Sequence, residues 1–198
     1  MLKELCLLNG TSGDEGAVRE FIISQIKDYC DYKVDALGSI IAFKKGKNKP
    51  SKKVMICAHM DEVGFIITDI TDDGYLKFAP VGGIDARIVA DRKIKINDIY
   101  GVVGLKPIHL LSGDEKDKAV SFKNLYIDIG ANDKKDAEKY VSLGDYAYFV
   151  SDYYEFGNGF IKAKALDDRI GCTLMIELIK SELKYDTYFC FNVQEEVG

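Results

Sequence analysis

Apolar positions recur along the chain with two different periods, and these periods predict where helices and strands lie. Over residues 16–30 the apolar residues recur at helical spacing, which predicts an amphipathic helix. Two runs rich in branched residues follow at 39–46 and 53–59 with a lysine-rich segment between them, a pattern typical of a strand, a solvated turn and a second strand. His59 therefore falls at or just past the end of a predicted strand.

Short β-like runs occupy the middle of the chain, from residue 63 to about residue 161, with glycine-containing turn signals between them. One helical stretch, 133–142, interrupts them. This pattern predicts a small β-barrel or sandwich inserted into an α/β domain. After the insertion, residues 165–183 predict a loop that runs into a helix, and the apolar run 187–193 predicts a buried strand that leads to Gln194.

Composition and charge narrow the class of protein. With 47% hydrophobic and 30% charged residues, the 198-residue chain is typical of a globular protein. Its net charge of −5 and the lack of an Arg-rich run disfavour nucleic acid as a partner. No apolar run approaches membrane-spanning length, and segment 1–10 is too short and polar for a signal peptide, so we expect a cytoplasmic protein without a membrane partner. Five cysteines without a CxxC pair are typical of reduced, buried thiols.

Three polar motifs adjoin the predicted elements, and the first contains one of the two histidines of the chain. In the motif His59-Met60-Asp61, the imidazole can bind a divalent metal while the carboxylate two residues on, on the same side of an extended chain, orients the ring. A lone histidine at a strand end is more often structural. This motif alone is therefore weak evidence for a metal site.

Paired carboxylates form the other two motifs. Asp167 and Asp168 precede a predicted helix, where a carboxylate can bridge two cations or cap the helix, and for Asp168 capping is at least as good an interpretation. Glu195 and Glu196 follow a buried strand, where one can bind a metal while the other handles protons, or both can lie on a solvated edge. Because sites in open α/β sheets gather at the carboxyl ends of strands, we expect the three motifs to cluster.

Taken together and in this order, the motifs resemble the tetrahedral aminopeptidase family of co-catalytic two-metal peptidases. This family includes glutamyl and deblocking aminopeptidases and proteins filed as cellulase M or endoglucanase. The matching motifs, which extend over nearly the whole chain, are SGDE, AHMDEVGF, VGGIDAR, GVVGLKPIHL, LYIDIGA, ALDDRIG and QEEVG. The resemblance implies a mixed-sheet, phosphorylase/hydrolase-like α/β metallopeptidase domain at 1–64 and 160–198, truncated at its C-terminal part. The inserted β-barrel domain at 65–159 would serve assembly and gating.

The resemblance also implies a role for each candidate residue. His59 and Glu196 would each bind one of two divalent metal ions, and Asp167 would bridge both. Asp61 would orient His59. Glu195 would be the general base that takes a proton from the metal-activated water, which then attacks the first peptide carbonyl of a substrate with a free N-terminus.

Further expectations follow from the same resemblance. The peptide bond between Asp167 and Asp168 is expected to be cis. Zinc or cobalt would be the metal, and peptides would be the substrates. The assembled form would be a large homo-oligomer such as a dodecamer. Family members also continue beyond the QEEVG motif and supply two further ligands, an Asp and a His.

His109 is a poor substitute for the missing ligand and is better interpreted as a structural histidine of the β domain. Because family members continue beyond this chain, we expect the chain by itself to have an incomplete sheet and an exposed apolar surface, to bind metal weakly and to be inactive.

Two alternatives remain open. One is a non-catalytic fragment that serves in assembly. The other is an endoglucanase, which the absence of Trp disfavours although 12 Tyr leave some room for sugar binding.

Overall fold

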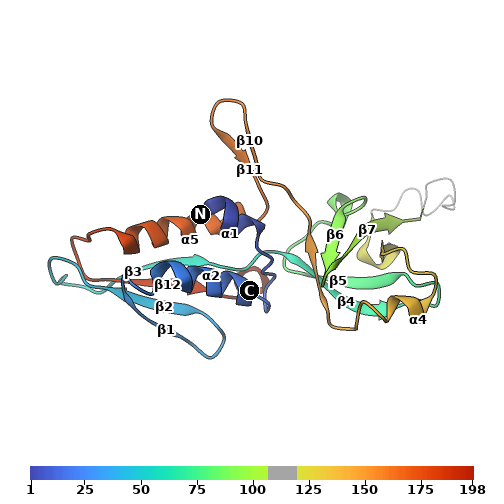
Figure 1. The fold of residues 1–198 in the computed structure, drawn as a ribbon, viewed down its shortest axis with the longest axis horizontal. Helices are drawn as coiled ribbons and strands as arrows, with labels where there is room; N and C mark the ends of the chain where they lie inside the picture. Colours follow the sequence, from blue (N-terminus) through green and yellow to red (C-terminus); the bar gives the residue numbers. More distant parts are fainter. Residues whose placement is uncertain (107–119) are drawn as a thin grey trace. The chain divides into compact units, whose positions relative to one another are not determined.

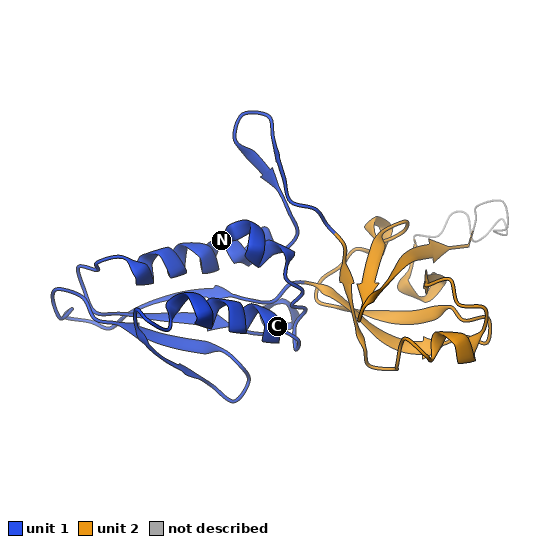
Figure 2. Cartoon of the chain, in the orientation of Figure 1, with its two compact units in different colours: residues 1–62, 151–198 blue, residues 63–150 orange. Residues whose placement is uncertain are grey.

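The structure, a computed structural model, describes residues 1–106 and 120–198. These residues form two compact units, drawn in different colours in Figure 2. Unit 1 consists of residues 1–62 and 151–198, and unit 2 consists of residues 63–150. The contacts thus place the second unit at 63–150, whereas the inserted domain was expected at 65–159. His109 lies outside the described residues, so its predicted structural role stays a prediction.

Unit 1 is a four-stranded mixed sheet with helices packed on it (Figure 1). The strand order is β1-β2-β12-β3, in which β12 runs antiparallel to β2 and parallel to β3. The strands are β1 (Asp31–Val34), β2 (Ile40–Lys44), β12 (Thr187–Asn192) and β3 (Val54–His59). The helices are α1 (Leu2–Leu7), α2 (Gly16–Ile26) and α5 (Leu166–Lys180). A two-stranded hairpin, β10 (Tyr154–Phe156) and β11 (Phe160–Lys162), completes the unit.

The core of unit 1 lies between one face of the sheet and the helices. Along β12 burial alternates with a period of two, so that Phe189 and Phe191 are buried and their neighbours are half-buried. These rings pack with side chains from all three helices, including Leu5, Ile22 and Ile176. The core therefore fixes β12 in the middle of the sheet.

Apolar side chains also lie at the surface of unit 1, as the sequence analysis expected. On strand β3, Met55 is 54% exposed, and on helix α5, Leu174 is 59% exposed. In α5 the exposed Ile170, Leu174 and Leu178 recur every four residues and thus form one stripe.

Unit 2 is a closed antiparallel barrel, which confirms the predicted inserted β-barrel. Its core contains Phe65, whose ring meets those of Phe78 and Phe149 at centroid distances of 4.8 and 4.9 Å. The helical stretch expected over 133–142 is shorter in the structure, where α4 spans Lys134–Ala137 and turns follow it. In barrel order the strands are β4 (Gly64–Ile70), β5 (Leu76–Val81), β8 (Leu125–Asp128), β7 (Ile99–Leu105), β6 (Lys93–Ile96) and β9 (Tyr146–Phe149).

Among the described residues, no helix combines the length and the apolar character that crossing a membrane requires. In the described part of the chain, short 3-10 helices supplement the main elements. They are η1 (Ala86–Ile88) and η3 (Phe122–Asn124) in unit 2, and η4 (Glu195–Val197) in unit 1.

Candidate active site

Two neighbouring parallel strands bring two of the predicted motifs to one edge of the sheet. The last residue pair in the β3–β12 register is His59 with Asn192. One residue further on, the Met60 N–H donates to the Asn192 carbonyl at 2.8 Å. Because both strands end here, the loop 59–62 and the turn that holds Glu195 leave the sheet side by side.

The third motif lies at the start of α5, and its two aspartates differ in their contacts. The bond between Asp167 and Asp168 is cis, as the resemblance implies. The Asp168 Oδ1 accepts the Gly171 N–H at 3.0 Å, which supports the capping interpretation of this residue. The Asp167 side chain is 90% exposed, and its Oδ1 lies 3.2 Å from His59 Nε2. A Cβ at Gly171 would collide with the Asp168 carboxylate, so a larger residue there would displace this side chain and its hydrogen bond with the Gly171 N–H.

The imidazole of His59 stands between carboxylates on both sides. Its Nε2 lies 3.2 Å from Asp167 Oδ1 and 3.8 Å from Glu195 Oε2. Its Nδ1 lies 3.3 Å from Asp61 Oδ1 and 3.2 Å from the Asp61 carbonyl. Burial favours the neutral ring, but the hydrogen bond with Asp167 and the charges of Asp61 and Glu195 outweigh it and raise the pKa of His59.

Asp61 is fully buried and does more than contact the imidazole. Its Oδ2 accepts the Ser12 hydroxyl at 2.6 Å and the Glu196 N–H at 3.0 Å, and its Oδ1 accepts the Glu195 N–H at 3.1 Å. Burial alone would raise the pKa of Asp61, but these hydrogen bonds lower it. The carboxylate thus joins the loop of His59 to the turn of Glu195 and Glu196, a link that sequence reasoning missed.

The two glutamates of the turn present different environments. The Glu195 side chain is 61% exposed, so it can reach solvent or a substrate. Burial raises the pKa of the Glu196 carboxyl, and the charge of His59 opposes that effect. His59, Asp61, Asp167 and Glu195 therefore meet through side-chain contacts, whereas Glu196 joins them through its backbone N–H.

The types of donor atom in this cluster fit a divalent cation. Imidazole nitrogen and carboxylate oxygen are the ligands that zinc and related ions accept, and the contact of His59 Nδ1 with Asp61 leaves Nε2 facing the exposed Asp167. Within residues 1–106 and 120–198, however, no group of three or more His, Cys, Asp or Glu side chains is arranged so that it could hold a metal ion. The described residues thus provide suitable donors without a complete ligand shell.

A buried ionic network supports the loop that follows His59. Arg169 is fully buried and donates to the Met60 carbonyl at 2.7 Å and to the Leu5 carbonyl at 2.5 Å. Nearby, Lys164 Nζ lies 2.5 Å from Glu62 Oε1. Neither basic residue was predicted, because only the folded chain brings them to the loop.

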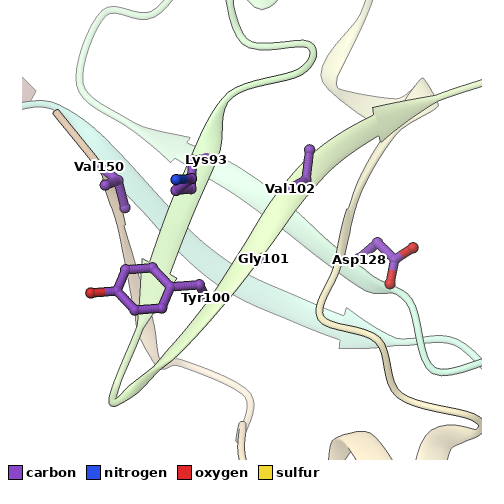
Figure 3. Close-up of a pocket in the computed structure, with 6 residues that line it drawn as sticks. All are labelled: Lys93, Tyr100, Gly101, Val102, Asp128 and Val150. Atoms are coloured by element: carbon purple, nitrogen blue, oxygen red, sulfur yellow. The ribbon is translucent and has the colours of Figure 1, made fainter.

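Unit 2 has a surface hollow of its own, with a volume of about 460 Å³ (Figure 3). Gly101 lies in its wall, where a Cβ would approach Ile127 Cγ2 to 2.7 Å. None of the five predicted site residues lines it. The lining residues are Lys93, Tyr100, Gly101, Val102, Asp128 and Val150.

Known proteins are similar to this chain in both fold and sequence. The Thermotoga maritima structure named endoglucanase is 45% identical to this chain, with a TM-score of 0.85. The match covers 99% of this chain and 60% of the T. maritima chain. The *Pyrococcus horikoshii* TET1 peptidase is 38% identical, with a TM-score of 0.87, and the whole chain covers 61% of it. The lysyl aminopeptidase of *Pyrococcus furiosus* is 32% identical, and the whole chain covers 59% of it.

The α/β unit with its inserted barrel and its His-carboxylate cluster therefore belongs to a class of peptidase-like proteins. Residues 38–198 match the M42 glutamyl aminopeptidase family, and the chain belongs to that family. It spans about three-fifths of the length of the relatives described above.

Proposed function

We propose that the complete polypeptide containing this chain is a metal-dependent aminopeptidase that removes N-terminal residues from peptides in the cytoplasm. Family membership supports the reaction class. The observation that carries the proposal is the environment of His59, whose Nδ1 contacts the buried Asp61 while its Nε2 faces Asp167 and Glu195. A ring held in this way directs Nε2 toward a ligand, while Nδ1 stays in contact with Asp61.

Under this proposal, His59, Asp167 and Glu196 hold two divalent ions, zinc or cobalt, together with ligands from the rest of the polypeptide. Bound ions of this kind polarise a carbonyl and make a water molecule more acidic. Asp61 orients the His59 ring and fixes the backbone of the turn at Glu195 and Glu196. The ligand types at these positions support the assignment.

Glu195 is the proposed general base. Its carboxylate is exposed and lies 3.8 Å from His59 Nε2, while its own backbone N–H is fixed by Asp61. The fixed backbone therefore directs the Glu195 side chain toward the proposed ligand residues. From there it can accept a proton from the attacking water and return it to the nitrogen of the departing amine.

The test is hydrolysis of aminoacyl anilides and of peptides with free or acetylated N-termini by the complete polypeptide with cobalt or zinc. Glu195→Gln is expected to lower kcat by about 100-fold or more while metal content stays unchanged. Glu182→Gln, at a side chain that is 81% exposed, is the matched control. Full activity of Glu195→Gln, or an inactive wild-type protein at saturating metal, would contradict the proposal.

The name of the *T. maritima* relative raises a second activity, glycoside hydrolysis. Glycosidases place two carboxyls on either side of the scissile bond, about 5 to 9.5 Å apart. In this chain Asp167 and Glu195 instead face one imidazole nitrogen, which favours the peptidase. Hydrolysis of soluble cellulose that survives Glu195→Gln would reverse this preference.

Assembly is part of the proposal. The P. horikoshii relative is described as able to assemble into a tetrahedron or a large octahedral shell. We expect the complete polypeptide to form a homo-oligomer such as a dodecamer, with unit 2 serving assembly and gating. Light scattering coupled to size-exclusion chromatography measures the mass. A monomer at micromolar concentration would contradict the expectation. Assembly without any peptidase activity would support the non-catalytic alternative.

A further inference from the structure

The segment 11–15 near the start of the chain contacts both loops that carry the candidate site. Thr11 forms a parallel bridge with Glu62, whose N–H donates to the Gly10 carbonyl at 2.9 Å. The Ser12 hydroxyl donates to Asp61 at 2.6 Å, and Glu15 accepts the Gln194 N–H at 3.1 Å. The segment thus holds the loop after β3 and the turn after β12 at once.

Three successive backbone N–H groups of the turn donate hydrogen bonds to two buried carboxylates. The Gln194 N–H donates to Glu15, and those of Glu195 and Glu196 donate to Asp61, at 3.0 to 3.1 Å. Glu15 is 3% exposed and Asp61 is fully buried. Hydrogen bonds to ionised acceptors are about twice as strong as neutral ones, so these carboxylates determine the path of the turn.

Helix capping does not explain Glu15. It occupies the N-cap position of α2, yet its side chain makes no cap hydrogen bond. Instead its Oε1 accepts the N–H groups of Gly13 and Gln194. Gln194 itself has a left-handed backbone with φ of 59°, a conformation that residues other than glycine rarely adopt, so the turn that Glu15 contacts is conformationally constrained.

We infer that Glu15 and Ser12 are positioning residues of the site, and this inference rests on the proposed aminopeptidase function. Glu15 holds the start of the turn by accepting the Gln194 N–H. Ser12 holds the Asp61 carboxylate, which in turn accepts the N–H groups of Glu195 and Glu196. Together they set the direction in which the Glu195 carboxylate leaves the backbone. A shift of about 1 Å in a reacting group can lower the rate about 100-fold, so these residues act on kcat without touching the substrate.

The experiment compares Glu15→Ala with Glu15→Gln in the complete polypeptide. Gln keeps an oxygen that can accept both N–H groups, whereas Ala removes the acceptor. We expect Glu15→Ala to lower kcat at least tenfold with KM changed less than threefold, and Glu15→Gln to restore most of kcat. Glu20→Ala, an exposed glutamate on the same helix, is the matched control and keeps wild-type kcat.

Hydrogen–deuterium exchange gives a second measurement that does not depend on activity. In Glu15→Ala the amides of residues 194–196 are expected to exchange at least tenfold faster, with no such change in Glu20→Ala. Ser12→Ala is expected to act in the same direction and Ser12→Thr, which keeps the hydroxyl, to restore protection. The exposed Ser24→Ala serves as its control.

The outcomes separate this inference from the proposed function. An active wild type with unchanged kcat and unchanged exchange in Glu15→Ala overturns the positioning role. A loss of kcat that Glu15→Gln fails to recover, although the protein is folded, also overturns it. An inactive wild type overturns the aminopeptidase proposal instead, and the exchange of residues 194–196 still decides whether Glu15 holds the turn.

Discussion

Lys164 and Glu62 form an ion pair that is almost completely withdrawn from water. Their side chains are 9% and 6% exposed, and Lys164 Nζ also donates to the Leu8 carbonyl at 3.0 Å. Burial lowers the pKa of Lys164, while the charge of Glu62 opposes that effect. The charged lysine is stable there because its Nζ donates hydrogen bonds to three oxygen atoms, those of the Leu8 carbonyl, the Asn9 side chain and the Glu62 carboxylate.

Lys164→Met should therefore destabilise the protein strongly, since it leaves Glu62 buried without its main partner. We expect the free energy of unfolding to fall by about 3 to 5 kcal/mol, measured by denaturant titration. Lys47→Met is the control, because its pair with Glu182 is 67% and 81% exposed and contributes less than about 1 kcal/mol. Similar losses in both variants would refute this account.

Among single residues, the sequence identified the polar groups of the candidate site but not what holds them. His59, Asp167 and Glu195 could be selected because each adjoins an apolar run, and the structure places them in contact. Their roles came from the resemblance and stay predictions. Glu15 and Arg169 lie within the SGDE and ALDDRIG motifs, but the sequence did not indicate their partners, which lie far away in the chain and are brought to them only by the fold.

At the scale of elements, strong apolar runs were predicted well, and short elements with few or no buried residues were missed. Strands β2, β3 and β12 carry the branched and aromatic residues that mark buried strands, and the structure contains all three. In contrast, all four residues of β1 are exposed, so no alternation reveals it. Helix α1 buries only Leu5 and Cys6, and the hairpin β10–β11 buries no residue, so neither element has a periodic pattern.

The short helix α4 illustrates how polar side chains stabilise such an element, and it has a defined pH dependence. Hydrogen bonds from Lys139 and Asn132 lower the pKa of Asp136 to about 2, from 3.8. Because the folded pKa is depressed, the stabilisation is complete above about pH 4 and is lost as the pH falls towards 2.

We therefore expect the carboxyl carbon of Asp136 to titrate near pH 2 in an NMR experiment on the folded protein. Asp136→Asn should weaken the dependence of unit 2 stability on pH between about 4 and 2. The exposed Asp73, on a turn of the same unit, supplies the control Asp73→Asn, which should leave that dependence unchanged. A midpoint for Asp136 near 3.8 would show that these hydrogen bonds do not persist in solution.

For the whole molecule, the two units differ in whether their residues form one continuous segment of the sequence. Unit 1 is discontinuous, and its strand β12 from the second segment lies between β2 and β3 from the first. Residues 1–62 therefore lack a central strand of their own sheet. Unit 2 is continuous, and its first and last strands, β4 and β9, pair with each other through Phe65 and Ala147. Its two ends thus lie close together, as an inserted domain requires.

Residues 63–150 should consequently fold when produced alone. The barrel is closed, so each of its described strands pairs on both sides, and its core is formed by its own residues, such as Phe65, Ile94 and Ile127. We expect one cooperative thermal transition in circular dichroism and a dispersed amide NMR spectrum for this segment. Residues 1–62, produced in the same way, should remain unfolded, because the rings of Phe189 and Phe191 that fill their core come from the second segment. An unfolded barrel segment would mean that the barrel depends on unit 1 for its stability.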